Sequence, residues 1–376
     1  MITTTKLPPI IWLNVAIFTS TFLVAVIVAP LYAWHIGFDW IQVTMLLGAF
    51  TFCGMSITTG YHRLWSHKTY EANTGMRIIL AIGGAFALQN SILHWSSDHR
   101  LHHRHVDNND KDPYSAKMGF FYSHIGWMLR EYQASRYRDY TNCRDLQKDN
   151  IVMWQHKYYV PLAVVTNVGI PLVFGIIHGD IFGALLLVGV VRLVLSHHTT
   201  FFINSLAHVW GSQPYTDKNT ARDNGFLAFL TFGEGYHNYH HIFENDYRNG
   251  IRWWQFDPTK WLIKTCEWLG FAANLRVCPE DRIEKARVKM QHQQLQLKLS
   301  AIPNSQARLE RLDEEYEALL KKIADYYAVQ KRMLDMKKKH LLKQYDSFEF
   351  MQQYNEMKRL LVEQRRRWKY LTAQYG

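Results

Sequence analysis

Cysteine is scarce in this chain, and its placement excludes two classes of protein. Only four of the 376 residues are cysteines (Cys53, Cys143, Cys266 and Cys278), and no two of them form a C-x-x-C pair. Neither a disulfide framework nor a thiolate metal site is therefore indicated. The composition, 48% hydrophobic and 14% aromatic, also excludes a disordered or collagen-like chain.

Charge is missing from long apolar stretches in the first 210 residues. Residues 10–34 contain no charged side chain, and this stretch is long enough to cross the hydrocarbon of a bilayer. Three similar stretches lie at 38–60, 158–177 and 181–207, so we expect four transmembrane helices. Arg192 falls inside the fourth stretch, where snorkelling or structural pairing is favoured over a functional role.

The distribution of basic residues predicts the orientation of these helices. The loops 35–39 and 178–180 contain no Lys or Arg, whereas 61–157 is rich in both. By the positive-inside rule, both termini are then cytosolic. The apolar stretch 76–93 is short, is interrupted by Gln89 and Asn90, and has polar clusters on both sides. We expect it to be a buried or re-entrant helix and not a fifth span.

Nineteen histidines are the unusual feature of the sequence, and many fall in four short clusters. The clusters are HRLWSH, DHRLHHRH, NSLAH and GEGYHNYHH. On a helix, spacings of three and four residues place side chains on one face, so rings within a cluster can converge. Imidazole suits zinc, copper, iron and nickel, and so many histidines exceed one zinc site. The pattern predicts two transition-metal ions, with Asp98, Asp107 and Glu234 placed to accept the outer ring N–H groups.

Other histidines have a simpler interpretation as surface or capping residues. These are His35, His94, His124, His156, His178, His197, His198, His292 and His340.

The four clusters, together with the string DPYSAKMGFFYSHIGW, make the sequence resemble the membrane-bound fatty acyl-CoA desaturases, closest to the stearoyl-CoA Δ9-desaturase type. The resemblance covers about residues 7–278. It implies an all-α integral membrane protein with four transmembrane helices and a cytosolic helical cap that holds a histidine-rich dimetal site. A C-terminal helical tail follows, so the predicted domains are 1–280 and 281–376.

Carried over position by position, the resemblance implies a set of metal ligands, with Asn204 acting through a water. The histidines are His62, His67, His99, His102, His103, His208, His237, His240 and His241, and His105 lies outside the matching positions. The cofactors would be two iron ions. The reaction would use O2 and two electrons to insert a cis double bond, at Δ9, into a long-chain saturated acyl-CoA.

The substrate residues follow partly from depth below the metals. A helix rises about 1.5 Å per residue, so Phe50 and Gly54 fall where the end of an acyl chain would lie. Phe50 is expected to close the tunnel and Gly54 to leave space, although ordinary helix packing explains both equally well. By resemblance, Thr200 and Phe201 also line the tunnel, and Asn90, Trp95 and Asp98 hold the head group.

The head-group pattern departs from the family at two places. Ser97 stands where animal members have Arg, and a basic pair after the GW motif is reduced to Arg130 followed by Glu131. An acyl-lipid, an acyl-carrier protein or a hydroxylase reaction therefore stays open. A histidine-based metal transporter is a rival of another class, but its ligands should lie at mid-membrane.

Electrons must come from another protein, because the sequence has neither the HPGG motif of a fused cytochrome b5 domain nor an iron–sulfur cysteine pattern. A cytochrome b5 or a ferredoxin-type donor is expected, attracted by the basic face. Localisation would be the endoplasmic reticulum in a eukaryote and the inner membrane in a bacterium.

Residues 281–376 hold 21 Lys and Arg against 13 Asp and Glu. No nucleic-acid-binding motif accompanies this charge, so membrane lipid is the simpler partner and nucleic acid is not expected. After a linker at 301–305, apolar residues recur at helical spacing and predict one or two long helices. Self-association through 305–371, packing on the cap and binding to the membrane stay open.

Overall fold

The computed structural model describes residues 7–338 and 344–376. His340 and part of the predicted self-association segment lie outside these residues. The chain forms two compact units, residues 1–213 with 219–277, and residues 278–376 with 214–218. Each unit is described by itself below.

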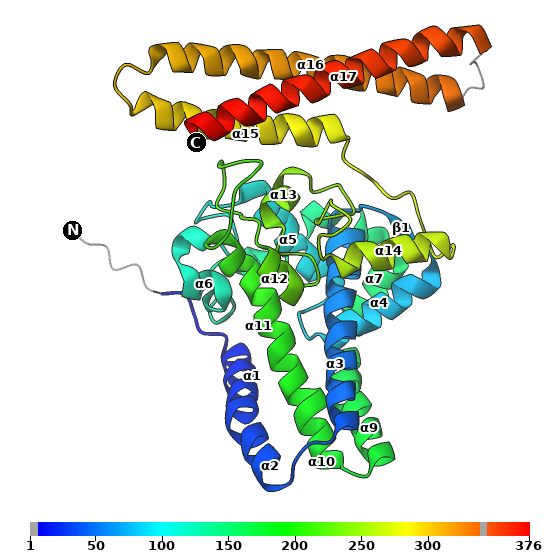
Figure 1. The fold of residues 1–376 in the computed structure, drawn as a ribbon. Helices are drawn as coiled ribbons and strands as arrows, with labels where there is room; N and C mark the ends of the chain where they lie inside the picture. Colours follow the sequence, from blue (N-terminus) through cyan, green and yellow to red (C-terminus); the bar gives the residue numbers. More distant parts are fainter. Residues whose placement is uncertain (1–6, 339–343) are drawn as a thin grey trace. The chain divides into compact units, whose positions relative to one another are not determined.

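Four apolar helices of the first unit are long enough to cross a membrane, and they confirm the predicted spans (Figure 1). They run over Trp12–His35, Trp40–Ser66, Tyr159–His178 and Ile181–His208. All four contain π-helical turns. The segments in chain order are α1 Trp12–Leu23, η1 Val24–Val28, α2 Ala29–His35, α3 Trp40–Met55, η2 Ser56–Ser66, α8 Tyr159–Val164, η8 Val165–Gly169, α9 Ile170–His178, α10 Ile181–Ala184, η9 Leu185–Val191, α11 Arg192–Asn204 and the 3-10 turn η10 Leu206–His208.

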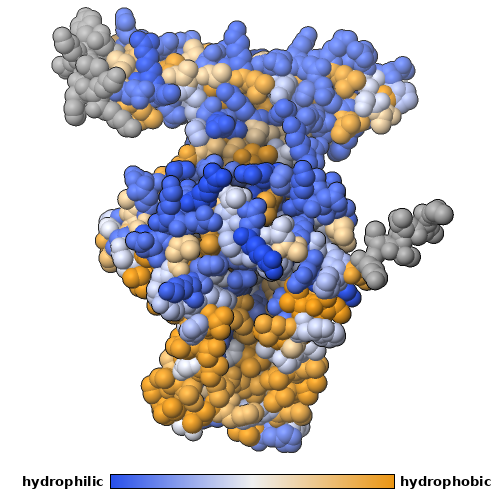
Figure 2. Space-filling view, turned by 180° about the vertical axis from the view of Figure 1, so that it is seen from behind, coloured by the Kyte–Doolittle hydropathy of each residue, from blue (hydrophilic) through white to orange (hydrophobic). Residues whose placement is uncertain are grey.

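The hydropathy of the surface follows this division (Figure 2). The spans present a broad hydrophobic face, and the cap that they carry is mostly hydrophilic. The tight connections at the far end of the spans are fixed by Asp180. Its carboxylate accepts hydrogen bonds from the hydroxyl of Tyr32 at 2.6 Å, from Nε2 of Gln42 at 2.7 Å and from the backbone N–H of Gly183 at 2.8 Å. The hairpin ends are therefore pinned together by one carboxylate.

The cap is built from short helices between and after the spans. They are α4 Thr74–Phe86, α5 Ile92–His105, η3 Ala116–Met118, α6 Phe120–His124, η4 Gly126–Met128, η5 Ala134–Tyr137, η6 Thr141–Cys143, η7 Leu146–Lys148, α7 Asn150–Lys157, α12 Gly225–Leu230, α13 His237–Ile242 and α14 Pro258–Trp268. Strand β1 (Glu71–Ala72) pairs antiparallel with β2 (Ala272–Ala273). Helix α4 is shorter than a span, as predicted for 76–93, and its buried face packs in the core that surrounds η2.

Arg192 is fully buried in the fourth span, which supports structural pairing and rules out snorkelling. Its guanidinium donates to the carbonyl of Phe86 at 2.6 Å and to Oδ1 of Asn167 at 2.7 Å, and it stacks 3.9 Å from the Phe86 ring centroid. Further donors reach the carbonyls of Val188 and Gly189. Carbonyl and amide oxygens, two from other helices and two from its own span, thus satisfy the cation without a carboxylate.

The second unit contains three long helices. They are α15 Glu280–Ser300, α16 Gln306–Lys338 and α17 Gln344–Tyr375, and residues 301–305 form the turn between the first two. A common apolar core joins the three helices, and it includes Val288, Leu295, Leu299, Leu312, Leu319, Ile323, Leu361, Trp368 and Leu371. Most of the periodic apolar residues of the tail are therefore packed in the core of this three-helix bundle.

Candidate metal centre and its cavity

Nine histidine side chains gather in two groups in the first unit. Within each group the candidate ligand nitrogens lie within 4.8 Å of one another. The first group is His62, His67, His99, His103 and His240, and the second is His102, His208, His237 and His241. Seven of the nine are buried, and His103 and His241 are half-buried. The structure thus brings together every histidine that the resemblance assigns as a ligand.

Four segments far apart in the sequence supply these rings. The π-helical end of the second span carries His62 and, at its C-cap, His67; the 3-10 turn that ends the fourth span carries His208, and α5 and α13 carry three each. Helix α5 divides its rings, because His99 and His103 lie one turn apart in the first group while His102 joins the second. Helix α13 divides its rings in the same way.

The Nε2 atoms of both groups point at one another. In the first group His62 and His240 are 2.9 Å apart, His240 and His103 2.9 Å, and His67 and His99 2.8 Å. In the second group the Nε2 of His237 lies 3.1 Å from those of His208 and His241. Each group therefore has a common centre that its ring nitrogens face.

Four of the opposite ring nitrogens are held by acidic side chains, directly or through a hydroxyl. Nδ1 of His62 lies 2.8 Å from Glu234, Nδ1 of His103 lies 3.0 Å from Glu244, and Nδ1 of His102 lies 2.9 Å from Asp112. Nδ1 of His208 contacts the Thr220 hydroxyl at 2.8 Å, and that hydroxyl donates to Asp107 at 2.6 Å. Of the three carboxylates predicted for this position, Glu234 contacts a ring, Asp107 acts through Thr220, and Asp98 does not contact these rings.

The donor chemistry fits a cation at each centre. A carboxylate can only accept, so a neighbouring Nδ1 carries the proton and the Nε2 lone pair faces inward. Facing lone pairs repel one another, and a shared cation removes that repulsion. Two nitrogens bonded to one metal at about 2.1 Å and about a right angle would lie about 3.0 Å apart. The Nε2 separations run from 2.8 Å to 3.3 Å, which is the range that two nitrogens sharing one cation would need.

Burial lowers the pKa values of several of these rings. Desolvation holds the pKa values of His67, His99, His237, His240 and His241 well below the usual range, and neighbouring histidines lower them further. Burial lowers the pKa of His103 to about 4. For Glu234 burial alone would raise the pKa, but the neighbouring His62 and Arg63 outweigh it and hold the pKa below its usual value. The site thus offers neutral imidazoles backed by an ionised carboxylate.

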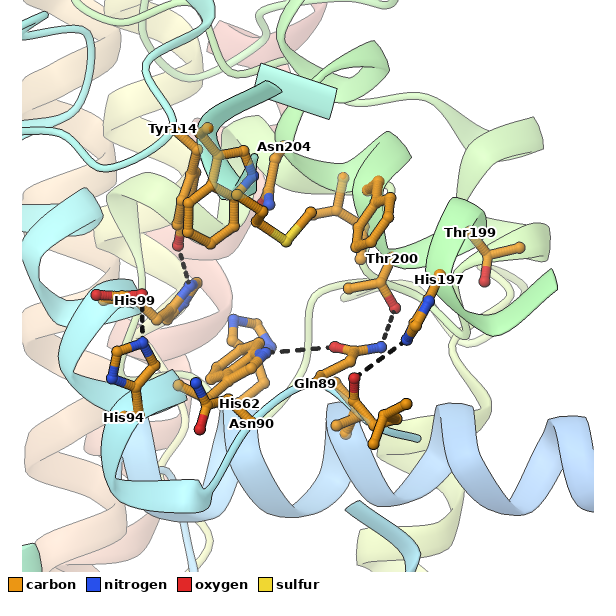
Figure 3. A pocket seen from close by; sticks show the side chains of 18 of the residues that line it. His62, Gln89, Asn90, His94, His99, Tyr114, His197, Thr199, Thr200 and Asn204 are labelled. Atoms are coloured by element: carbon orange, nitrogen blue, oxygen red, sulfur yellow. Dashed lines mark hydrogen bonds and ion pairs between the residues drawn. The ribbon is translucent and has the colours of Figure 1, made fainter. Parts of the chain in front are cut away.

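A cavity of about 190 Å³ lies beside the first group (Figure 3). His62 and His99 line it, so the candidate metal position borders the cavity wall. Its apolar part includes Gly54, Ile57, Phe201 and Phe232, and its polar part includes Asn90, His94, Asp98, Trp127 and Arg136. The cavity therefore has the lining expected of a site for an amphiphilic ligand.

Six of the seven predicted substrate residues line this cavity, and Phe50 does not. The six are Gly54, Asn90, Trp95, Asp98, Thr200 and Phe201, and Asn204 lines it as well. The hydroxyl of Thr200 accepts from Nε2 of Gln89 at 2.8 Å, an interaction drawn in Figure 3. Phe50 stacks against Phe232, with ring centroids 5.4 Å apart, so it reaches the cavity only through that residue.

Several residues of the site escaped the sequence reasoning. Asp112 and Glu244 back the histidines, and Phe232, Trp127 and Arg136 line the cavity. Asp112 opens the DPYSAKMGFF string, and Glu244 follows His241 by three residues, so a search for carboxylates near the clusters could have found both. The other three gave no periodic signal.

Some histidines set aside as surface residues are in fact buried. His94 and His197 line the cavity, and His124 packs between Ser205 and His198 at 2.9 Å from each. Each uses its ring nitrogens in hydrogen bonds, such as that of His197 to the carbonyl of Leu88. They are thus hydrogen-bonded core residues that the sequence could not distinguish from surface ones.

The four spans and the two histidine groups define an integral membrane protein with a candidate metal centre at one end of its helices. Comparison with known families agrees: the fatty acid desaturase family model matches residues 38–272, and the chain belongs to this family.

Curated relatives carry related names. A "probable acyl-CoA desaturase" of Schizosaccharomyces pombe is 46% identical over 247 residues, which are 65% of this chain and 51% of the relative. Acyl-CoA desaturase 1 of Saccharomyces cerevisiae is 38% identical over 299 residues, 77% of this chain and 56% of the relative. Stearoyl-CoA desaturase 5 of Bos taurus is 36% identical over 289 residues, 74% of this chain and 84% of the relative. The chain thus spans about half the length of the two fungal relatives.

Proposed function

We propose that this protein is an acyl-CoA desaturase that inserts a cis double bond, at Δ9, into a long-chain saturated acyl-CoA with O2 and two electrons. The observation that carries the proposal is the amphiphilic cavity whose wall contains His62 and His99 of the first histidine group. The printed names of the three relatives support the substrate class and the reaction.

Two iron ions are the proposed cofactors. The first would be held by His62, His67, His99, His103 and His240, and the second by His102, His208, His237 and His241, with Asn204 acting through a water. When bound, the irons supply the reductive activation of dioxygen and the removal of hydrogen from an unactivated methylene. The chain's own contribution is to present neutral Nε2 atoms, which Glu234, Glu244 and Asp112 orient by accepting the Nδ1 protons.

The cavity positions the acyl chain and keeps water away from it. Gly54, Ile57 and Phe201 offer apolar surface to the chain, and Phe232 stands at the end where Gly54 lies. Burying each methylene there contributes about 0.8 kcal/mol. This binding free energy holds one carbon pair beside the first histidine group, in an interior from which water is excluded.

The polar part of the cavity receives the head group. Asn90, Trp95 and Asp98 are proposed to contact the thioester and the arm that follows it. Trp95 is held in place by its Nε1–H, which donates to Oε1 of Gln89 at 3.4 Å. Because Gln89 also donates to Thr200, the head-group side and the acyl side of the cavity are tied together.

Orientation and partners complete the proposal. By the positive-inside rule, the basic segment 61–157 supports a cytosolic cap and cytosolic termini, and a separate cytochrome b5 or ferredoxin-type donor would bring electrons there. The desaturase domain would extend over residues 1–280.

Expression in a desaturase-deficient host tests the function. We expect new monoenoic acids with the double bond at Δ9 when a competent electron donor is present, and metal analysis of the purified protein should find two irons per chain. The His240→Ala variant serves as the inactive control. Absence of any new monoenoic acid from a well-expressed wild-type protein, with the donor supplied, would refute the proposal.

A further inference from the structure

His124 joins two segments that are more than 70 residues apart in the chain. It is the last residue of α6, and its ring lies against the end of α11 in the fourth span. Nδ1 is 2.9 Å from the hydroxyl of Ser205, and Nε2 is 2.9 Å from Nδ1 of His198. Because these two partners are seven residues apart in the sequence, the ring bridges about two helical turns.

The direction of the hydrogen bond between His124 and Ser205 follows from the serine. The Ser205 hydroxyl donates its only proton to the backbone carbonyl of Phe201 at 2.9 Å, so it accepts from the ring. Nδ1 of His124 then carries the proton, and the bare Nε2 accepts from Nδ1 of His198. Burial lowers the pKa of His124 to about 4, which agrees with a neutral ring that carries one proton.

Ser205 lies where the fourth span changes from an α-helix to a 3-10 turn. Its backbone angles, φ −111° and ψ −68°, depart from those of an α-helix, and its side chain is fully buried. Its carbonyl accepts the backbone N–H of His208 at 3.1 Å, and its amide follows directly after Asn204, which is labelled at the cavity in Figure 3. Two residues assigned to the metal centre therefore flank Ser205, and their relative orientation depends on its conformation.

Aromatic side chains pack around the His124 ring. Phe120 stacks on it with ring centroids 5.6 Å apart, and the ring centroid of Phe202 lies 4.9 Å away. The imidazole is buried in this environment. A phenylalanine at position 124 would therefore occupy the same apolar surroundings and would lose only the two hydrogen bonds, so bonding and packing can be tested separately.

We propose that His124 is a positioning residue for the second histidine group, and that its bond to Ser205 sets the turn that presents His208 and Asn204 to the second metal ion. The Thr220 hydroxyl orients the ring of His208, whereas Ser205 fixes the backbone that carries it. The inference rests on the proposed function, since it takes the second group as a metal site. The first group contains no residue of this turn, so the two sites should respond differently when the bond is removed.

Binding of ferrous iron to the metal-free, full-length protein in detergent tests this role without turnover. His124→Phe should weaken the second site about tenfold, as expected when an outer partner of a ligand is lost. The iron content after desalting should then fall from two toward one per chain. The remaining iron should give the Mössbauer spectrum of His237→Ala, which lacks a ligand of the second group, and not that of His67→Ala, which lacks one of the first.

Two amide variants distinguish the ring nitrogens. The side-chain nitrogen of asparagine lies close to the position of Nδ1, so His124→Asn should keep the bond to Ser205 and should bind iron within about twofold of wild type. Glutamine instead reaches the position of Nε2, so His124→Gln should lose about as much affinity as His124→Phe. Rescue by asparagine alone would assign the effect to the Nδ1–H donor.

Ser205→Ala removes the same bond from its other end. It should weaken the second site as much as His124→Phe does, and the double variant should show no further loss, because both changes delete one interaction. Ser196→Ala is the matched control and should bind two irons like wild type. It removes a buried hydroxyl from the same helix, and Ser196 does not line the cavity.

Three outcomes overturn the proposal. They are an unchanged second-site affinity in both His124→Phe and Ser205→Ala, equal losses in His124→Asn and His124→Phe, and equal weakening of both sites, which would show a general loss of structure. The proposed function is judged separately, on the wild-type protein. Fewer than two bound irons in wild type would overturn both proposals, whereas two bound irons without desaturation of any thioester would overturn only the function.

Discussion

Chain-length selection should depend on the contact between Gly54 and Phe232. A Cβ added at Gly54 would lie 2.1 Å from Cε2, 2.6 Å from Cδ2 and 2.8 Å from Cζ of the Phe232 ring. Ordinary carbon contacts are about 3.5–4.0 Å. Gly54→Ala must therefore displace the ring by roughly 1.5 Å.

The ring has little freedom to retreat. Phe50 packs against the Phe232 ring, and the backbone carbonyl of Phe232 accepts a hydrogen bond from the Thr259 hydroxyl at 2.8 Å. That hydroxyl is itself 2.7 Å from the hydroxyl of Thr58. The ring is then expected to turn into the cavity and to shorten it by one to two methylenes, since each methylene extends a chain by about 1.3 Å.

The expected magnitude follows from lost burial. Two methylenes excluded at about 0.8 kcal/mol each amount to about 1.6 kcal/mol, or on the order of tenfold in kcat/KM. Competition assays with acyl-CoA substrates of 14 to 20 carbons should show that loss for the longest accepted chain in Gly54→Ala. Phe232→Ala should shift the preference toward longer chains by two or more carbons.

The double variant and a glycine control decide the matter. In Gly54→Ala/Phe232→Ala the effect of the alanine at 54 should largely disappear, because its collision partner is gone. Gly48→Ala, on the same helix with no atom within 4 Å of its added Cβ, should leave the product lengths unchanged. If Gly54→Ala leaves the chain-length profile of wild type, or acts equally strongly without Phe232, the reasoning fails.

Three further changes test the metal centre and the membrane core. Glu234→Gln should weaken metal binding about 10–100-fold, because His62 loses the carboxylate that orients it; titration with ferrous iron measures this. Chelation should make stability acid-sensitive, since neutral histidines such as His103, with a pKa of about 4, resist protonation only when folded. The free energy of unfolding of the metal-free protein should therefore fall as the pH is lowered from about 6.5 toward 4, by up to about 1.4 kcal/mol per pH unit and histidine, and its melting temperature should fall with it. Arg192→Leu should lower stability in detergent by about 2–4 kcal/mol, since buried oxygens lose their donor.

Each of these tests has an outcome against it. Unchanged iron affinity in Glu234→Gln would show that the carboxylate is not an orienting partner. A melting temperature of metal-free protein that is flat over this pH range would contradict the buried neutral rings. A fully stable Arg192→Leu variant would show that hydrogen bonding to Arg192 is dispensable.

The spans could be predicted because apolar length is a local property of the sequence. Three of them begin and end within two residues of their predicted limits. The second continues to Ser66 and not to residue 60, because its last turns are polar yet still helical and end in the first histidine cluster. Hydropathy therefore predicts the end of the apolar stretch, whereas the helix itself continues beyond it.

The division of the histidines into two groups could not be predicted from the sequence. Spacing indicated that the rings of α5 share a face, but His102 joins one group and its neighbour His103 joins the other. That choice depends on the end of the second span and also on α13 and the end of the fourth span, which are both more than 100 residues away in the chain. Arg136 and Phe232 were missed for the same reason, since only tertiary contacts place them at the cavity.

The arrangement around Arg192 also bears on how the chain is made. The two residues from other helices that bond its guanidinium through oxygen, Phe86 and Asn167, precede it in the sequence and are synthesised first. A cation left alone in lipid is costly, so the final span gains most by entering the bilayer against helices that are already present. We therefore expect the last span to insert against the helices that carry Phe86 and Asn167. Removing these two partners should slow the release of the last span from the insertion machinery into the bilayer.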